Sequence, residues 1–236
     1  MSRREEGRSG RIAVVVHQEH SDPGRIGAAL SGRGYALDIR RHACGDPLPE
    51  RLDEYDGVVV FGGPMSANDD HLDFIRSELA FVERVAATDT RFLGVCLGAQ
   101  LMARARGARV CCHPDKLYEI GYVEITPTQA GRDWFDRPLN VYQWHGEGFD
   151  LPDDAVALAC GEVFRNQAAQ FSPRSLGIQF HPEVTGAMMR RWQVKAAHRL
   201  VEPGAQAAEA QCRDWVRHDA ALAHWLEGFL DRWLAT

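Results

Sequence analysis

Cys96 lies between two glycines in the stretch Gly94-Val95-Cys96-Leu97-Gly98, where an apolar run gives way to a helical pattern. A nucleophile flanked by glycines is typical of a strained turn from strand to helix, because larger flanking residues would collide across so sharp a turn. A helix beginning at Cys96 would also point free backbone N–H groups at the sulfur and favour the nucleophilic thiolate. The same stretch fits a buried core cysteine with glycines for close packing. Taken alone, it leaves both interpretations open.

A thiol nucleophile needs a base, and the stretch GIQFHPEV contains the best-placed of the ten histidines. In an extended segment side chains two positions apart point the same way, so His181 and Glu183 would project together. A carboxylate beside an imidazole fixes its tautomer and stabilises the imidazolium that forms when the ring takes a thiol proton. An exposed His-Pro-Glu turn is the alternative. Most other histidines, His17 among them, lack an orienting partner nearby and are expected to lie at the surface.

The stretch VVVFGGP supplies a third element, because a strand that ends in Gly62-Gly63 leaves backbone amides uncovered by side chains. Such amides are what an oxyanion hole requires. The amide of Leu97, next to Cys96, would be a second donor. A glycine turn that binds nothing is the alternative, but the three stretches together are more specific than any one alone.

The elements that must position these residues form a repeating pattern in the first half of the chain. Apolar strands alternate with segments of helical spacing at residues 11–17, 23–34, 35–41, 55–64, 71–87 and 90–95. Continuous apolar strands alternating with helices indicate a parallel sheet covered on both faces. Ligands of such sheets sit beyond the carboxyl ends of the strands, which predicts that Gly62-Gly63 and Cys96 lie at the same edge.

The second half has a different pattern. Residues 108–181 contain short strand-like pieces with polar turns, which predict an antiparallel extension followed by the return of the last central strands. After Pro182 the chain reads as helical, with a break at 201–206. We therefore expect a disordered tail at 1–10, one α/β domain at 11–200, and a helical extension at 201–236 that packs on the same domain.

Composition excludes several classes of function. The chain has 236 residues and a net charge of -6, and its Lys and Arg residues are scattered, which argues against nucleic-acid binding. No apolar stretch is long enough to span a bilayer, so no membrane association is expected. The six cysteines lack the regular spacing of a secreted disulfide framework. Reduced thiols and a cytoplasmic location are the expectation.

The motifs GGP, GVCLGAQ and GIQFHPE, in this order, resemble those of the class I glutamine amidotransferases of the triad type. The resemblance covers residues 11–192. Within this family the sequence is most similar to stand-alone members related to the glutaminase domain of GMP synthetase. In these proteins WHGE at 144–147 and FDLP at 149–152 also have counterparts. The resemblance implies a flavodoxin-like three-layer α/β/α sandwich with a mixed central sheet. It also implies hydrolysis of the γ-amide of glutamine through a γ-glutamyl thioester.

The same resemblance implies roles for individual residues. Cys96 matches the nucleophile, His181 the general base and acid, and Glu183 the residue that orients the histidine. The amides of Gly63 and Leu97 match the oxyanion hole. The positions that match the substrate-binding segments are Gly62, Gln100, His145, Gly146 and Glu147. Glu147 departs from the family pattern, in which aspartate is common.

No cofactor or metal is expected. The chain contains no GxxxxGK[ST] loop and no glycine-rich pyrophosphate loop. Cys111-Cys112-His113 has metal-like composition, but adjacent cysteines on a strand point to opposite faces and do not easily bind one ion. Because the chain ends before a synthetase domain would begin, released ammonia is expected to pass to a separate synthetase subunit. Otherwise, transfer of the γ-glutamyl group to water is itself the purpose.

Three functions therefore remain to be compared. The first is a glutamine amidotransferase-type hydrolase that releases ammonia. The second is a γ-glutamyl peptidase that acts on a small γ-glutamyl peptide or metabolite, with the same three residues and a different leaving group. The third is a catalytically idle binding or regulatory module that keeps the pocket. The three catalytic residue types occurring together argue against the third.

Overall fold

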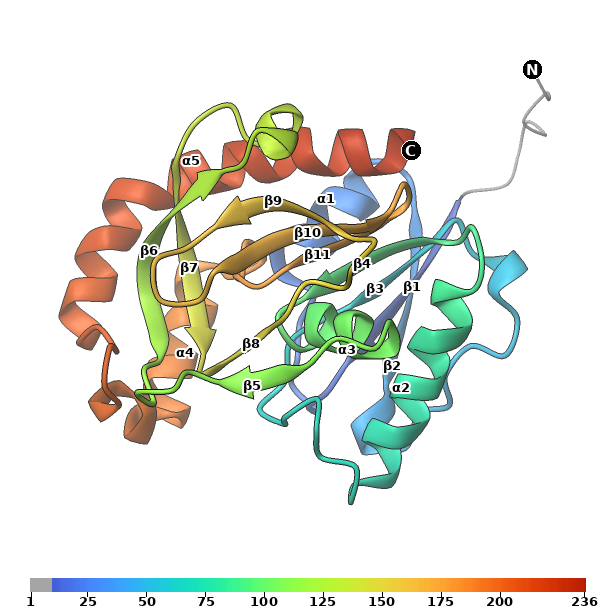
Figure 1. Ribbon diagram of the computed structural model, residues 1–236, viewed down its shortest axis with the longest axis horizontal. Coiled ribbons are helices and arrows are strands. Elements are labelled where there is room, and N and C mark those ends of the chain that lie inside the picture. Colours follow the sequence, from blue (N-terminus) through green and yellow to red (C-terminus); the bar gives the residue numbers. More distant parts are fainter. Residues whose placement is uncertain (1–9) are drawn as a thin grey trace.

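The computed structural model describes residues 10–236; most of the tail predicted at 1–10 lies outside that part. A nine-stranded mixed sheet forms its centre, with strand order β2-β1-β3-β4-β11-β10-β9-β6-β7 (Figure 1). The strands of this sheet are β1 (Arg11–Val16), β2 (Ala36–Arg41), β3 (Gly57–Val60), β4 (Arg91–Val95), β6 (Glu119–Pro127), β7 (Leu139–His145), β9 (Val156–Cys160), β10 (Asn166–Ser172) and β11 (Ser175–Ile178). A small antiparallel pair, β5 (Val110–Cys112) and β8 (Glu147–Phe149), lies beside it.

The strands β2, β1, β3, β4 and β11 pair in parallel. Their register places Val60 beside Gly94 and Val95 beside Ile178. The strands β3, β4 and β11 therefore end together, at one edge of the sheet. The segments that follow them carry Gly62, Cys96 and His181, so the register alone brings these three residues to that edge.

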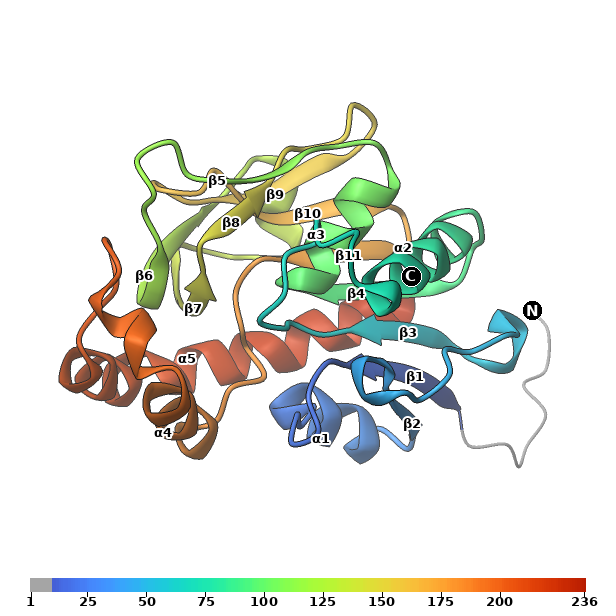
Figure 2. The same cartoon turned by 90° about the horizontal axis from the view of Figure 1, so that it is seen from below.

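Helices cover both faces of the parallel part, as Figure 2 shows. The helices are α1 (Gly24–Gly32), α2 (Asp73–Ala86), α3 (Leu97–Ala105), α4 (Gly186–Lys195) and α5 (Ala208–Ala235). Val14 and Val16 of β1 belong to the same buried cluster as residues of α1 and α5, whereas Ala13 and Val15 pack with residues of α2 and α3. This alternation follows from the two-residue period of a strand, and it confirms the predicted three-layer α/β/α sandwich with a mixed sheet.

The second half forms the antiparallel extension. The strands β10, β9, β6 and β7 continue the sheet beyond β11, and each pairs antiparallel with its neighbour. Two details differ from expectation. β11 ends at Ile178, short of the expected end at residue 181, and β8 is a strand that the sequence pattern did not predict.

The C-terminal helix α5 packs along the face that also holds α1. Its apolar side belongs to the main core, and Trp233 is completely buried there with its Nε1 donating to the carbonyl of Phe92 on β4. The 3-10 segment η4 (Ala197–Val201) precedes α5, and the Gln206 amide donates to the carbonyl of Ile120 on β6. Within residues 10–236, no helix is both long and apolar enough to cross a membrane.

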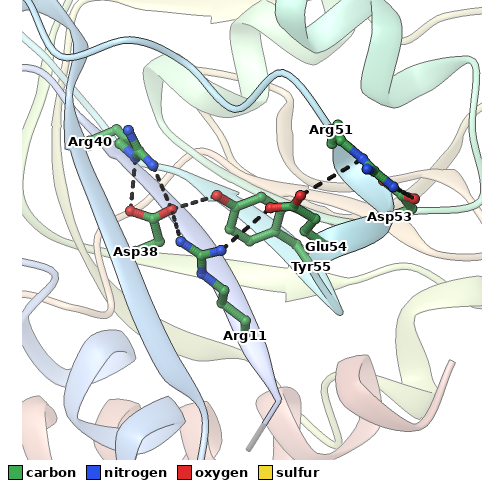
Figure 3. Close-up of polar contacts among 7 residues, drawn as sticks. All are labelled: Arg11, Asp38, Arg40, Arg51, Asp53, Glu54 and Tyr55. Atoms are coloured by element: carbon green, nitrogen blue, oxygen red, sulfur yellow. Dashed lines mark hydrogen bonds and ion pairs between the residues drawn. The ribbon is translucent and has the colours of Figure 1, made fainter. Parts of the chain in front are cut away.

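Polar side chains tie β1 to β2 at the opposite end of the sheet (Figure 3). Arg11 forms an ion pair of 2.8 Å with Asp38, which also accepts from Arg40 and from the Tyr55 hydroxyl. Arg11 is the first residue of β1, so this cluster lies at the amino ends of the strands. The cluster ties the outermost strand β2 to β1, far from the carboxyl ends of the strands where Cys96 lies.

Candidate active site

Cys96 occupies the turn between β4 and α3. Its backbone has φ 50° and ψ -107°, a conformation that residues other than glycine adopt rarely and at a cost in energy. The Cys96 amide donates to the carbonyl of Ile178 at 2.8 Å, and its carbonyl accepts from the Gln100 amide at 3.0 Å. The end of β11 and the first turn of α3 therefore hold the strained residue from both sides.

Close packing of α3 on β3 explains the glycine that follows. A Cβ atom at Gly98 would overlap the carbonyl oxygen of Val60 on β3. That oxygen is backbone and cannot rotate away, so any other residue would push the helix off the sheet. The glycine is thus required by the close approach that points Cys96 at the carboxyl edge.

His181 and Glu183 lie in the turn that leads from β11 to α4. The Nδ1 atom of His181 is 2.8 Å from Oε1 of Glu183, and the His181 amide donates to the carbonyl of Tyr142 on β7 at 2.8 Å. Both side chains are buried. Because Nδ1 faces the carboxylate, Nε2 is the nitrogen left for the Cys96 thiol, which lies close enough to this ring to raise its pKa. The three side chains form one continuous chain of contacts.

The charges around His181 favour its protonated form. Burial by itself lowers the pKa of His181, but the Glu183 carboxylate and the Cys96 sulfur outweigh it and raise the pKa to about 10. Trp192 of α4 also meets the imidazole edge-on, with ring centroids 5.1 Å apart. The carboxylate and the indole together fix the orientation of the ring.

Gly62 and Gly63 form the wall opposite His181. A Cβ atom on Gly62 would lie 2.7 Å from Cε1 of His181 and 3.3 Å from Cβ of Cys96, so only glycine fits between these two side chains. Within residues 10–236, the backbone N–H groups of Gly63 and Leu97 donate no hydrogen bond to another protein atom. Both amides predicted for the oxyanion hole are therefore free to bind a ligand.

A hydrogen bond from Gln100 on α3 holds the segment 145–147 in place. The Gln100 side chain is buried, and its Nε2 donates to the carbonyl of Glu147 at 2.9 Å and to Oε1 of Gln179 at 3.2 Å. The same carbonyl of Glu147 accepts from Nδ1 of His145 at 2.9 Å. The backbone of this segment thus has a fixed position relative to α3, on which Cys96 is the N-cap.

The residues of this segment make contacts in different directions. The His145 ring is buried, and its Nε2 is 3.1 Å from both Gln143 Oε1 and Glu119 Oε2. The Glu147 carboxylate approaches Cys112 Sγ, at 3.9 Å, on β5. Gly146 faces the ring of Tyr118, which leaves no room for a Cβ atom. The backbone of Glu147 joins this network, whereas its carboxylate extends toward β5.

His17 is the residue that the sequence analysis missed. We expected a surface role, but the structure buries its side chain completely. Its Nδ1 is 3.0 Å from the carbonyl of Gly62, and its Nε2 is 2.8 Å from Oε1 of Glu78 on α2. The partner is distant in sequence, so no local pattern reveals it. A usable signal existed, because His17 directly follows β1 and therefore reaches the same carboxyl edge as Cys96.

The cysteine pair beside the site belongs to no metal-binding cluster within residues 10–236. Cys111 and Cys112 are both exposed on β5. In the described part of the chain, no three His, Cys, Asp or Glu side chains come together as a metal site.

A family model describes most of this region. Residues 25–193 match the model of glutamine amidotransferase class-I. The chain is 33% identical over 225 residues to the glutamine amidotransferase-like protein YfeJ of Salmonella typhimurium, and the match covers 91% of this chain and 90% of that protein. Two relatives matched over shorter stretches are a glutamine-hydrolyzing GMP synthase subunit of Saccharolobus solfataricus, 32% identical over 137 residues, and gamma-glutamyl peptidase 5 of Arabidopsis thaliana, 27% identical over 159 residues. These matches cover 57% and 64% of this chain, and 71% and 62% of those proteins.

Solved structures agree with the sequence matches. A glutamine amidotransferase from Methylobacillus flagellatus superposes with a TM-score of 0.89 at 30% identity, covering 96% of this chain and 94% of that one. One from Thermotoga maritima gives a TM-score of 0.87 at 27% identity, covering 98% and 100%. The predicted family is therefore confirmed, and the chain belongs to the class-I glutamine amidotransferase family.

Proposed function

We propose that the protein is a thiol-dependent hydrolase that releases ammonia from the γ-amide of glutamine. The observation that carries this proposal is the continuous chain of contacts from Cys96 through His181 to Glu183. A cysteine activated by an adjacent base, with the base oriented by a third group, is the arrangement that covalent acyl transfer uses.

In the first half-reaction the Cys96 sulfur attacks the γ-carbonyl carbon of glutamine. The proton of the thiol is already on Nε2 of His181 when the sulfur attacks, and Glu183 stabilises this imidazolium. The negative charge that develops on the γ-oxygen is received by the amides of Gly63 and Leu97, which supports their assignment as the oxyanion hole. His181 then gives its proton to the leaving nitrogen, the C–N bond breaks, and ammonia departs from a γ-glutamyl thioester.

In the second half-reaction water replaces ammonia. His181 takes a proton from the water as its oxygen attacks the thioester carbon, and the same amides receive the new oxyanion. The C–S bond then breaks, the sulfur is released as a thiolate beside the protonated His181, and glutamate leaves. The two half-reactions use the same groups in the same positions, so no rearrangement of the site is needed between them.

Binding of the amino-acid end is assigned to Gly62, Gln100 and the segment His145-Gly146-Glu147. The Gln100 amide nitrogen is occupied, but no donor within residues 10–236 is paired with its oxygen. That oxygen is suited to accept from the α-ammonium group of the substrate. The backbone of the segment, which Gln100 fixes in place, would supply the remaining contacts.

The proposal is tested directly by comparing the rate of ammonia release from glutamine in Cys96→Ala and in the wild type. The variant is expected to lose turnover while its circular dichroism and thermal unfolding stay unchanged. Cys44→Ala removes an exposed cysteine that has no place in the site and serves as the matched control. Wild-type rates in Cys96→Ala would overturn the proposal.

A γ-glutamyl peptidase is the second candidate, and the relative named gamma-glutamyl peptidase 5 favours it. The chemistry at Cys96 would be the same, with a peptide amine as the leaving group in place of ammonia. Turnover on glutamine compared with turnover on glutathione-like γ-glutamyl peptides separates the two. A kcat/KM at least ten times higher for the peptides would favour the peptidase.

If glutamine is the substrate, we propose that a separate synthetase consumes the ammonia, by analogy with the relative whose name describes one component of GMP synthase. We place the activity in the cytoplasm, because all six cysteines are free. A catalytically idle module is the remaining alternative. It predicts that Cys96 fails to react with a glutamine-derived diazo-ketone in a well-folded sample.

A further inference from the structure

We propose that His17 is a positioning residue that locks the Gly62-Gly63 peptide in the orientation that presents its N–H group to the oxyanion. This inference rests on the proposed function, because it assigns a role within the same oxyanion hole. His17 makes its two hydrogen bonds to Gly62 and Glu78 rather than to Cys96 or His181, and it acts through the backbone.

Both ring nitrogens of His17 face an acceptor. Nδ1 lies 3.0 Å from the Gly62 carbonyl oxygen, and Nε2 lies 2.8 and 3.0 Å from the two carboxylate oxygens of Glu78. A carbonyl oxygen can only accept, so this contact requires a proton on Nδ1. The side chains of His17 and Glu78 are completely buried, so water does not compete for these bonds.

The carbonyl of Gly62 and the amide of Gly63 belong to one planar peptide unit. The residues described contain no cis peptide bond, so this unit is trans and its C=O and N–H groups point in opposite directions. Holding the oxygen toward His17 therefore holds the N–H away from His17. The Gly63 N–H has no partner among residues 10–236, as expected for a group reserved for a ligand.

A lock is needed because the peptide lies between two glycines. Glycine populates positive and negative φ with similar ease, so this unit could rotate and exchange the positions of its oxygen and its N–H. With the oxygen turned inward, the site would present a partial negative charge to a developing oxyanion. The hydrogen bond from His17 opposes that rotation, and it also polarises the peptide so that its N–H becomes a better donor.

Glu78 keeps His17 in the protonation state that this role requires. Burial by itself lowers the pKa of His17, but the Glu78 carboxylate and the Gly62 carbonyl outweigh it and raise the pKa above its ordinary value of 6.5. The Gly62 carbonyl and the Glu78 carboxylate both accept, so a ring with protons on both nitrogens satisfies both contacts. Glu78 comes from the middle of α2, so the lock connects the oxyanion loop to a rigid element.

Two substitutions separate the two contacts of His17. The amide nitrogen of His17→Asn takes the place of Nδ1 and can still donate to Gly62, whereas it cannot reach Glu78. The amide of His17→Gln extends to the place of Nε2 and loses Gly62. Loss of a whole oxyanion donor costs about 100- to 1000-fold in kcat, so a displaced donor in His17→Gln should cost about 10- to 100-fold. His17→Asn should retain more kcat than His17→Gln, with KM nearly unchanged in both.

The rate at which iodoacetamide alkylates Cys96 distinguishes a displaced oxyanion donor from a general structural defect, because only the structural defect would change this rate. Alkylation forms no oxyanion, so its rate should be the same in both variants as in the wild type. The extent of alkylation is measured by mass spectrometry of the tryptic peptide 92–104. Equal kcat losses in the two variants, or parallel losses of kcat and alkylation, would overturn the lock. A wild-type protein that turns over no γ-glutamyl substrate would instead contradict the proposed function.

Nuclear magnetic resonance of the wild-type protein tests the lock without any variant of His17. With 15N-labelled histidine, the inference requires a proton on Nδ1 of His17 at neutral pH. The signal is assigned by its shift in Glu78→Gln. An unprotonated Nδ1 would refute the inference even if both His17 variants failed to fold.

Discussion

The Nδ1 atom of His181 lies 2.8 Å from Oε1 of Glu183, while Oε2 of the same carboxylate is buried and has no partner within residues 10–236. A buried carboxylate with one free oxygen is costly unless its single partner carries positive charge. The arrangement therefore supports the proposed role of Glu183, which is to stabilise the imidazolium of His181.

Replacing this carboxylate should damage catalysis more than folding. In Glu183→Gln the uncharged amide no longer stabilises the imidazolium and can hold His181 in the wrong tautomer, so we expect kcat for glutamine hydrolysis to fall about 100-fold or more. Steady-state ammonia release measures the effect. Glu162→Gln, on the exposed surface, is the control. A loss of less than threefold in Glu183→Gln would contradict the assigned role.

The raised pKa of His181 makes its contribution to stability depend on pH. The folded-state pKa of about 10 lies above the ordinary value of 6.5, so the stabilisation is fully present below pH 6.5 and is lost as the pH rises through 10. Urea unfolding at several pH values should show the difference between the wild type and His181→Asn shrinking toward pH 10. His224→Asn, on the exposed side of α5, controls for loss of a histidine. A difference that grows with pH would show that the sign is wrong.

Replacement of glycine by alanine should have opposite effects on stability at Gly98, where α3 approaches β3 closely, and at the exposed Gly228 of α5. Gly98→Ala would force the helix away from the Val60 carbonyl and lower the free energy of unfolding by about 2 to 3 kcal/mol. Gly228→Ala, on α5, has nothing within 4 Å of the added methyl group and should raise it by about 0.5 to 1 kcal/mol. Urea unfolding of both variants is the measurement. A neutral Gly98→Ala would mean that the turn at Cys96 tolerates relaxation.

Packing of α5 on the sheet predicts a large stability effect far from the site. Trp233→Ala removes a fully buried side chain and its hydrogen bond to Phe92, and should lower the free energy of unfolding by about 3 to 5 kcal/mol. Val216→Ala, on the exposed side of the same helix, should change it by less than about 0.5 kcal/mol. A small effect of Trp233→Ala would contradict the view that α5 and the sheet share one core.

Gln100 should act mainly on substrate binding. Gln100→Leu fills the same space but removes both the donor to the Glu147 carbonyl and the free amide oxygen. We expect KM for glutamine to rise about 10-fold or more while kcat changes less, because contacts to the amino-acid end are kept from ground state to transition state. Gln170→Leu on β10 is the matched control. A fall in kcat with constant KM would place Gln100 at the reacting centre instead.

Much of the parallel half could be predicted from the sequence because local signals agree there. The apolar strands and the glycine-bounded turns identify β1, β3 and β4, and the rule for carboxyl ends places Cys96 and Gly62 together. The pairing of His181 with Glu183 was also expected, but for an incomplete reason. β11 ends at Ile178 and the pair forms in a turn, not in an extended strand.

The rest could not be predicted because it depends on contacts between distant segments. Glu78 follows Ile75 by three residues and precedes Val82 by four, so helical spacing places it on the buried side of α2. Its partner could not be predicted, because Glu78 reaches His17 only after α2 has packed on the sheet. The order β11-β10-β9-β6-β7 likewise follows from tertiary pairing, since each short strand alone would fit several neighbours. The assigned roles of the site residues remain predictions that the experiments above test.

The place of β11 in the sheet has a consequence for the newly made chain. β11 inserts beside β4, although it follows β4 only after the whole antiparallel extension, and His181 comes after β11. During synthesis Cys96 therefore leaves the ribosome long before His181, its proposed base. The hydrogen bond that holds its strained backbone, from the Cys96 amide to Ile178, is also absent until then. The contacts proposed to activate Cys96 therefore form only when the last central strand docks, and an unfinished chain lacks both of them.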